Sequence, residues 1–77
     1  MHRESAPLSQ IAEGGKAVIF SFHLNAPMKD RLYSLGMIPG TAIKCLYKRK
    51  GGLAAYSVRG AVIALRLSDA EHILVKK

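Results

Sequence analysis

The stretch that decides the fold reads Arg31-Leu32-Tyr33-Ser34-Leu35-Gly36-Met37-Ile38-Pro39-Gly40-Thr41. Leu32 and Leu35 are three residues apart and Met28 lies four residues before Leu32, so these three side chains share one face of a helix. Gly36 stands where a left-handed residue commonly ends a helix, because glycine has no Cβ to clash with the following carbonyl. The spacing therefore predicts a helix over about residues 26–35.

The end of the same stretch predicts a turn. Pro39 and Gly40 are typical of the central pair of a type II turn, in which proline presets φ and glycine takes a positive φ. The chain is then expected to enter a strand at Thr41. A helix-to-strand corner of this kind could serve packing alone, and local chemistry by itself favours that interpretation.

Outside this corner, the chain consists mostly of short strand-like segments. Apolar residues alternate with polar ones, or are concentrated, in residues 16–23, 41–48, 53–59, 61–67 and 73–76. The alternation in the second segment places Ile43, Cys45 and Tyr47 on one side of the strand. Turns are predicted at residues 50–52 and at Gly60. Four or five short strands with one inserted helix predict a mainly β fold closed into a small barrel, because closure removes unpaired strand edges.

Local signals place the caps and the chain end. Asn25 is expected to cap the start of the helix. Ser9 is expected to cap a short helical turn over residues 7–12, and Ser68 begins a capping-box pattern that predicts a single helical turn. Residues 1–6 show no periodicity and are expected to form a loose end.

Length and composition restrict the class of protein. The 77 residues predict a single domain, residues 1–77, that is too small to enclose a catalytic cavity. No apolar run approaches the ~20 residues that span a bilayer, and a single cysteine fits a reducing compartment, so we expect a cytoplasmic protein. The formal net charge of +7 suggests an acidic partner: nucleic acid, an anionic membrane or an acidic protein surface. A solvated basic surface without a partner is the simpler alternative.

No pattern of ligands or catalytic residues is found. Cys45, His2, His23, His72 and the three methionines lack the spacing of a metal site, and Cys45 alternates with apolar residues as a small buried hydrophobe does. No nucleophile stands beside a base, and the paired glycines lack the lysine and hydroxyl of a phosphate loop. We therefore predict no enzymatic activity, no catalytic residues, no metal site, no cofactor and no small-molecule substrate.

Taken together, these segments resemble the ferrous iron transport protein A (FeoA) family along nearly the whole chain, from Pro7 to Val75. The resemblance is carried by Leu35-Gly36-Met37-Ile38-Pro39-Gly40-Thr41 together with Pro7-Leu8, Gly15, Arg31-Leu32, Gly51-Gly52, Val58-Arg59-Gly60, Ala64-Leu65-Arg66, Ala70, Ile73 and Val75. It implies an SH3-like barrel in the cytoplasm with no known catalytic activity. Many relatives carry an acidic residue and a proline after the hairpin glycine, whereas Leu53 and Ala54 follow it here, so no contact through a charged hairpin tip is expected.

The resemblance also implies a partner. Proteins of this family are thought to assist FeoB, the membrane ferrous iron transporter with a cytosolic GTP-binding domain. We therefore expect an accessory protein of bacterial ferrous iron uptake that acts by protein–protein contact. The candidate contact residues lie on the helix and just after it: Arg31, Tyr33, Met37, Ile38 and Pro39. Met37 and Ile38 could equally staple the helix to the barrel.

Other functions stay open at this point. Lys44, Lys48, Arg49 and Lys50 are basic surface candidates that cluster on one strand and its turn, where the anionic inner face of the membrane or a nucleic acid could bind. Tyr47 points away from Lys44 and Lys48 in this strand, so basic and aromatic residues are not interleaved, and nucleic acid ranks below the membrane. The same domain type also resembles the C-terminal module of iron-dependent repressors, which suggests a regulatory domain as a further alternative.

Overall fold

One antiparallel sheet makes up most of the protein, and the computed structural model describes residues 5–77. In chain order the elements are β1 (Ala6–Pro7), η1 (Leu8–Gln10), β2 (Lys16–Phe22), α1 (Ala26–Ser34), β3 (Ala42–Arg49), β4 (Leu53–Val58), β5 (Ala61–Arg66), α2 (Leu67–Ala70) and β6 (Ile73–Lys76). The predicted mainly β fold with one inserted helix is confirmed. The sheet has six strands because the two-residue β1 also pairs, with β6.

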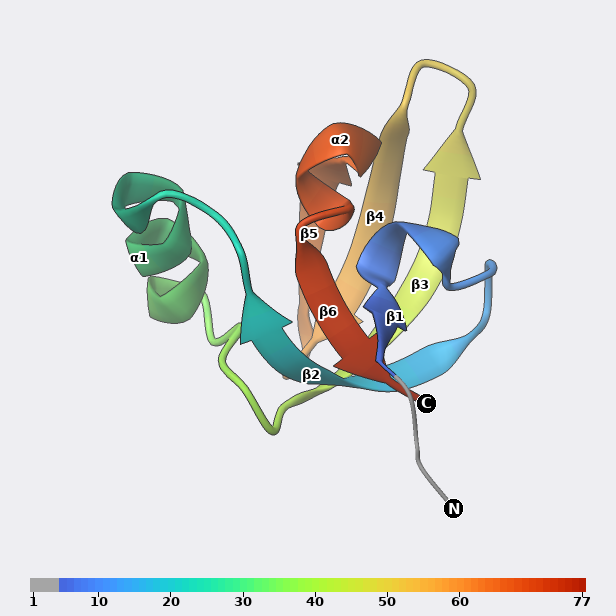
Figure 1. The fold of residues 1–77 in the computed structure, drawn as a ribbon. Coiled ribbons are helices and arrows are strands. Elements are labelled where there is room, and N and C mark those ends of the chain that lie inside the picture. The colour runs from blue at the N-terminus through green and yellow to red at the C-terminus, as the bar shows by residue number, and fades with distance from the viewer. Residues whose placement is uncertain (1–4) are drawn as a thin grey trace.

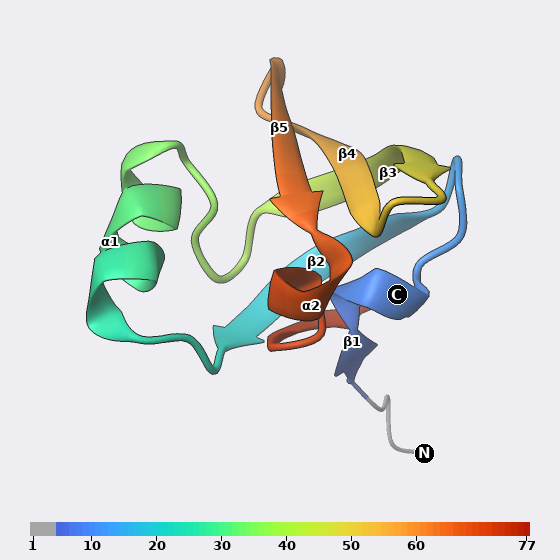
Figure 2. The ribbon, with the colours of Figure 1, turned by 90° about the horizontal axis from the view of Figure 1, so that it is seen from above.

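The strands follow one another in the order β1-β6-β2-β3-β4-β5 and curl around a single core (Figures 1 and 2). The two ends of this order, β1 and β5, are not paired with each other in the described residues. Instead, the short turns η1 and α2 contact each other, with α2 against β5 and η1 against β6. The barrel is therefore closed by helical turns rather than by a strand ladder, and β5 keeps a free edge.

The core is filled from the inner faces of the strands. In β2, Ala17 and Ile19 are buried while Val18 and Phe20 are exposed, so the predicted alternation holds. The other fully buried large side chains come from every part of the chain: Leu8, Leu32, Met37, Cys45, Tyr56, Val58, Ile73 and Val75. Since residues far apart in sequence share this core, no segment of the domain has a core of its own.

The alternation predicted for β3 fails at its end. A β-bulge interrupts the pairing between β3 and β4, so that Cys45 is opposite Tyr56 but Tyr47 is already opposite Ala55. The extra residue shifts the side-chain alternation, and Tyr47 is 41% exposed instead of lying beside Ile43 and Cys45. The prediction that Tyr47 faces the same way as Cys45 was wrong for this reason.

The corner at residues 34–41 is confirmed. Helix α1 ends at Ser34, and Gly36 has a φ of 94°. Gly40 has a φ of 92°, and the Thr41 backbone N–H donates to the Ile38 carbonyl at 3.1 Å, which closes the predicted turn. The chain thus leaves helix α1 and enters the sheet again within a few residues.

The predicted caps have different outcomes. The Asn25 side chain accepts a hydrogen bond from the Met28 N–H at 3.0 Å, as predicted. Ser9 lies inside η1 rather than before it, and α2 begins at Leu67 without a side-chain cap, so both of these cap predictions were wrong. The Leu67 N–H instead donates to the Gly52 carbonyl, at 2.6 Å, so the tertiary structure satisfies a group that a cap would serve.

The predicted loose N-terminal end does not extend to Ala6. Ala6 is in β1, opposite Val75 of β6. Residues 1–4, including His2, lie outside the described residues. Two paired residues are too few to show a period in sequence, and their partner lies at the other end of the chain.

Tyr56 is the largest fully buried side chain. Its hydroxyl has no hydrogen-bond partner among the described residues. Burial, and to a smaller extent the neighbouring Cys45, raises the pKa of Tyr56 to about 12. An unsatisfied buried hydroxyl costs about 1–3 kcal/mol, so this group does not stabilise the core.

We predict that Tyr56→Phe leaves the free energy of unfolding at neutral pH unchanged or increases it. The wild type should lose stability as the pH rises from 10 to 12, because the unfolded phenol loses its proton near 10 whereas the folded one keeps it to about 12. The variant should lose less over this range. Urea unfolding at neutral pH and at a pH of about 11 measures both effects, with Tyr47→Phe as the exposed control. A Tyr56→Phe variant that is clearly less stable at neutral pH would show that the hydroxyl has a partner.

Candidate partner-binding surface

A groove runs between α1 and the free edge of β5. It has a volume of about 470 Å³ and is lined by Met28, Arg31, Leu32, Leu35, Leu53, Ile63, Ala64, Leu65, Arg66 and Asp69. Figures 1 and 2 show α1 standing to one side of the sheet. Most of these side chains are apolar, with two arginines and one aspartate among them, so the groove fits an apolar segment with polar or acidic flanks.

The groove exists because α1 is only lightly attached to the sheet. Leu32 is its single buried residue. Tyr33 packs edge-on against Phe22 of β2, with 5.4 Å between the ring centres, and so fixes the side of the helix away from the groove. Leu35 was predicted to share a face with Leu32, and both line the groove, but Leu35 remains 46% exposed.

The backbone of β5 offers hydrogen-bonding groups along the groove. Arg59 and Gly60 have φ values of 54° and 82° and form a two-residue turn that joins β4 to β5. In such a hairpin the residues next to the turn exchange both hydrogen bonds, and every second residue does so from there on. The N–H and C=O groups of Val62 and Ala64 therefore point away from β4, toward the free edge, whereas Arg66 already stands at the N-cap position of α2.

The positions of the β5 side chains support this interpretation. Ile63 and Leu65 lie on the inner face of the strand, whereas Ala64 and Arg66 lie on the outer face. Residues from both faces line the groove, because it follows the edge of the strand rather than one of its surfaces. An apolar trough beside a free strand edge is the geometry in which an extended peptide adds a strand to a sheet.

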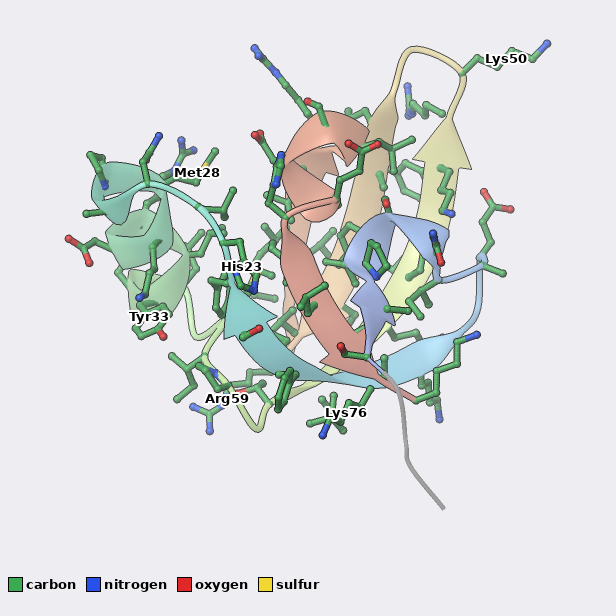
Figure 3. All side chains as sticks on the ribbon, in the orientation of Figure 1. His23, Met28, Tyr33, Lys50, Arg59 and Lys76 are labelled. Atoms are coloured by element: carbon green, nitrogen blue, oxygen red, sulfur yellow. The ribbon has the colours of Figure 1, made fainter. Side chains whose placement is uncertain are left out.

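The five predicted contact residues are distributed over four environments. Arg31 lines the groove. Tyr33 is partly exposed on the other side of α1, while Ile38 is half-buried and Pro39 is exposed in the turn (Figure 3 labels Tyr33). Met37 is fully buried, and its N–H donates to the Leu32 carbonyl at 3.0 Å. Its side chain therefore staples the helix to the core, which was the alternative that the sequence left open.

Most of the residues that line the groove were not predicted as contact residues. Leu53, Ala64 and Arg66 were assigned to strands without a surface role. The signal that could have found them is the order of strands, because only that order shows that β5 lies at an edge beside α1. Strand order depends on contacts between distant segments, which no local pattern reports.

Lys48, one of the four basic surface candidates, has a structural role. Its ammonium group donates to the Ser9 carbonyl at 2.7 Å, and its backbone N–H donates to the Glu13 carboxylate at 2.7 Å. Both bonds attach the end of β3 to the segment around η1. The side chain is half-buried, so Lys48 is not part of an open basic patch.

The other three basic candidates point to different parts of the surface. Lys50 lies at the tip of the β3–β4 hairpin (Figure 3). The Arg49 guanidinium lies 5.3 Å from the centre of the Tyr47 ring. Lys44 lies on the outer face of the sheet, opposite Lys16 of β2. The structure therefore does not bring the four basic residues together.

The described residues hold no group of three metal-ligating side chains of His, Cys, Asp or Glu. Cys45 is fully buried, and burial raises the pKa of its thiol, which keeps it protonated and unreactive. His23 and His72 are exposed, and His23 Nε2 lies 3.3 Å from the Ser21 hydroxyl. The absence of a metal site in the whole protein stays a prediction.

The fold and its groove define a class: a small SH3-like β domain with an inserted helix and an apolar groove beside it. The model of the FeoA domain matches residues 6–77, and the chain therefore belongs to the FeoA family. No curated protein matches the chain significantly. In the part of the chain that the structure describes, neither helix has the length and hydrophobicity needed to span a membrane.

Solved structures support the family and the fold. The crystal structure of an iron uptake regulatory protein (FeoA) shares 26% identity and a TM-score of 0.84, covering 95% of this chain and 97% of that one. The solution structure of the FeoA protein from Chlorobium tepidum shares 27% identity and a TM-score of 0.87, covering 91% and 68%. A manganese-dependent transcriptional repressor has a TM-score of 0.88 at 16% identity, and this chain covers 44% of it. At that identity the similarity shows the fold alone.

We predict that Asn25→Ala lowers the free energy of unfolding by about 1 kcal/mol, because the Met28 N–H loses its acceptor at the start of α1. Asn25→Asp keeps an acceptor oxygen and should stay within a few tenths of the wild type. Urea unfolding gives the free energies, and amide hydrogen exchange in α1 shows whether the change is local. Equal stabilities of the alanine and aspartate variants would contradict this role of the cap.

Proposed function

We propose that this protein is an accessory component of a bacterial ferrous iron uptake system that acts by contact with the cytosolic region of a FeoB-type transporter. Membership in the FeoA family supports the pathway. The observation that carries the mode of action is the groove between α1 and β5, an apolar trough beside a free strand edge. The protein would then work in the cytoplasm, at the inner face of the membrane where the transporter lies.

The contact we propose is strand addition. An extended segment of the transporter would pair with the backbone groups of Val62 and Ala64, and its apolar side chains would fill the trough beside Leu35. Arg31 and Arg66 would attract acidic residues that flank this segment, in keeping with the net charge of +7.

The proposal includes no chemistry performed by this chain. The family is one of small accessory domains. In the described residues, the cysteine that could act as a nucleophile or ligand is enclosed in the core. GTP hydrolysis would therefore belong to the partner, and the effect of this protein on it would be exerted through the groove.

We predict that a cytosolic FeoB-type domain, titrated into isotope-labelled protein, shifts the backbone resonances of β5 and of the groove side of α1. Ala64→Pro should weaken binding by about tenfold, because proline removes the edge N–H at this position while the bonds to β4 remain. Ala64→Val keeps the N–H and is the matched control.

A charge reversal tests the rim of the groove. Arg31→Glu should also weaken binding, whereas Lys50→Glu makes the same charge change at the hairpin tip, away from α1 (Figure 3), and should have little effect. Unshifted β5 resonances at near-millimolar partner, or equal binding by the Ala64→Pro and Ala64→Val variants, would refute strand addition.

A further inference from the structure

A second surface lies on the outer side of the sheet, which we call the basic outer face: Lys16, Val18, Phe20, Lys44, Arg59 and Lys76. The register of the strands brings these residues together. Lys16 is opposite Lys44, and Lys44 is in turn opposite Ser57 of β4. In the next row, Val18 is opposite Lys76 on one side and Ala42 on the other.

A shallow hollow marks the middle of this face. It has a volume of about 280 Å³ and is lined by Lys16, Ala42, Ile43, Lys44, Ser57 and Arg59. All of the charged side chains that line it are cationic. Arg59 and Lys76 extend from the same end of the molecule, below β2 in Figure 3, and the hairpin tip with Lys50 lies at the opposite end.

The positive charges of this face lie next to one another on neighbouring strands. Like charges directly opposite each other on neighbouring strands repel, so the pair Lys16 and Lys44 opposes folding. Among the described residues, no carboxylate lines the hollow. Of the described acids, Glu13 accepts a hydrogen bond from the Lys48 N–H, Asp30 lies in α1, and Asp69 and Glu71 lie in and directly after α2. Anions bound from outside would relieve this repulsion.

Exposed apolar side chains stand between the cations. Phe20 is 47% exposed and Val18 is 42% exposed, although polar residues could occupy these two exposed positions of β2. The Lys76 ammonium lies 4.1 Å from the centre of the Phe20 ring. An aromatic ring and an aliphatic side chain surrounded by lysines are suited to the boundary between anionic headgroups and acyl chains.

We propose that the basic outer face binds the surface of a membrane that contains anionic lipids. The cations would contact the headgroup phosphates, and Phe20 and Val18 would lie at the level of the glycerol backbone. A nucleic acid fits less well, because the described aromatic ring on this face is already covered by Lys76 and so is not open for base stacking. The face carries neither a free strand edge nor a deep pocket that would select a peptide, and a lipid surface needs neither.

This inference goes beyond the proposed contact at the groove. In the proposed function the groove would bind a protein segment at the edge of β5, whereas the basic outer face would hold the domain against the bilayer. The test uses the full chain and lipid alone, so its failure would leave the transporter contact standing, and failure of the transporter contact would leave it standing in turn.

Sedimentation with lipid vesicles tests the proposal. The protein should bind vesicles of phosphatidylcholine and phosphatidylglycerol mixed three to one, and should not bind vesicles of phosphatidylcholine alone. Binding should weaken as salt is raised, since the contacts to headgroups are screened. Phe20→Ser should also weaken binding. The ratio of the wild-type to the variant affinity should stay the same as the salt concentration rises, because an apolar contact is not screened.

Matched charge variants distinguish a specific face from net charge. Lys44→Gln should weaken binding to the mixed vesicles about fivefold, the effect of one basic residue at an anionic surface. Lys50→Gln removes the same charge from the hairpin tip and should leave binding nearly unchanged. Both side chains are exposed, and circular dichroism is the control that checks whether the variants are folded.

Three outcomes would overturn the proposal. The first is no binding to the anionic vesicles at low salt. The second is an equal loss of binding in the Lys44→Gln and Lys50→Gln variants, which would show an effect of net charge alone. The third is binding to a single-stranded oligonucleotide that Lys44→Gln weakens, together with no binding to vesicles, which would identify the face as a nucleic-acid surface.

Discussion

The attachment of α1 to the sheet is the constraint on which the groove beside β5 depends. One buried side chain, Leu32, anchors the helix, and Met37 holds its end through a side chain enclosed in the core. Gly36 and Gly40, both with a positive φ, then end the helix and turn the chain back to the sheet. Had α1 packed tightly along β5, the edge of that strand would be covered and the groove would not exist.

The two surfaces lie on different parts of the molecule and can act together. The groove follows the edge of β5, while the basic outer face spans β2, β3 and β6. Arg59 lies between them, because its Cδ would be 3.2 Å from a Cβ placed on Gly36, at the end of α1. A protein segment in the groove and a lipid surface below β2 would therefore be close neighbours, in keeping with the proposed contact with a membrane transporter.

Local patterns predicted the elements of the fold well. Asn25, Gly36 and the Pro39-Gly40 turn each act through their own backbone geometry, which is visible in sequence. Ser9 and Ser68 were misread because the start of α2 is satisfied by the distant Gly52 carbonyl, and the start of η1 follows Pro7. The face of β3 on which Tyr47 lies was predicted wrongly, because no residue pattern in the sequence indicates the β-bulge between Cys45 and Tyr47. Of the groove, only its α1 side could be anticipated, since the position of β5 at an edge results from long-range pairing.

The place of β6 has a consequence for synthesis of the protein. This last strand, Ile73–Lys76, lies between β1 and β2, which are the first two strands to leave the ribosome. β1 and β2 therefore wait for a neighbour that is made after every other strand of the domain, and pairing of distant segments is slow because a long loop must close first. Until then one edge of β2 and the apolar inner residues are exposed to non-native pairing, so this domain folds as one unit only after β6 has emerged.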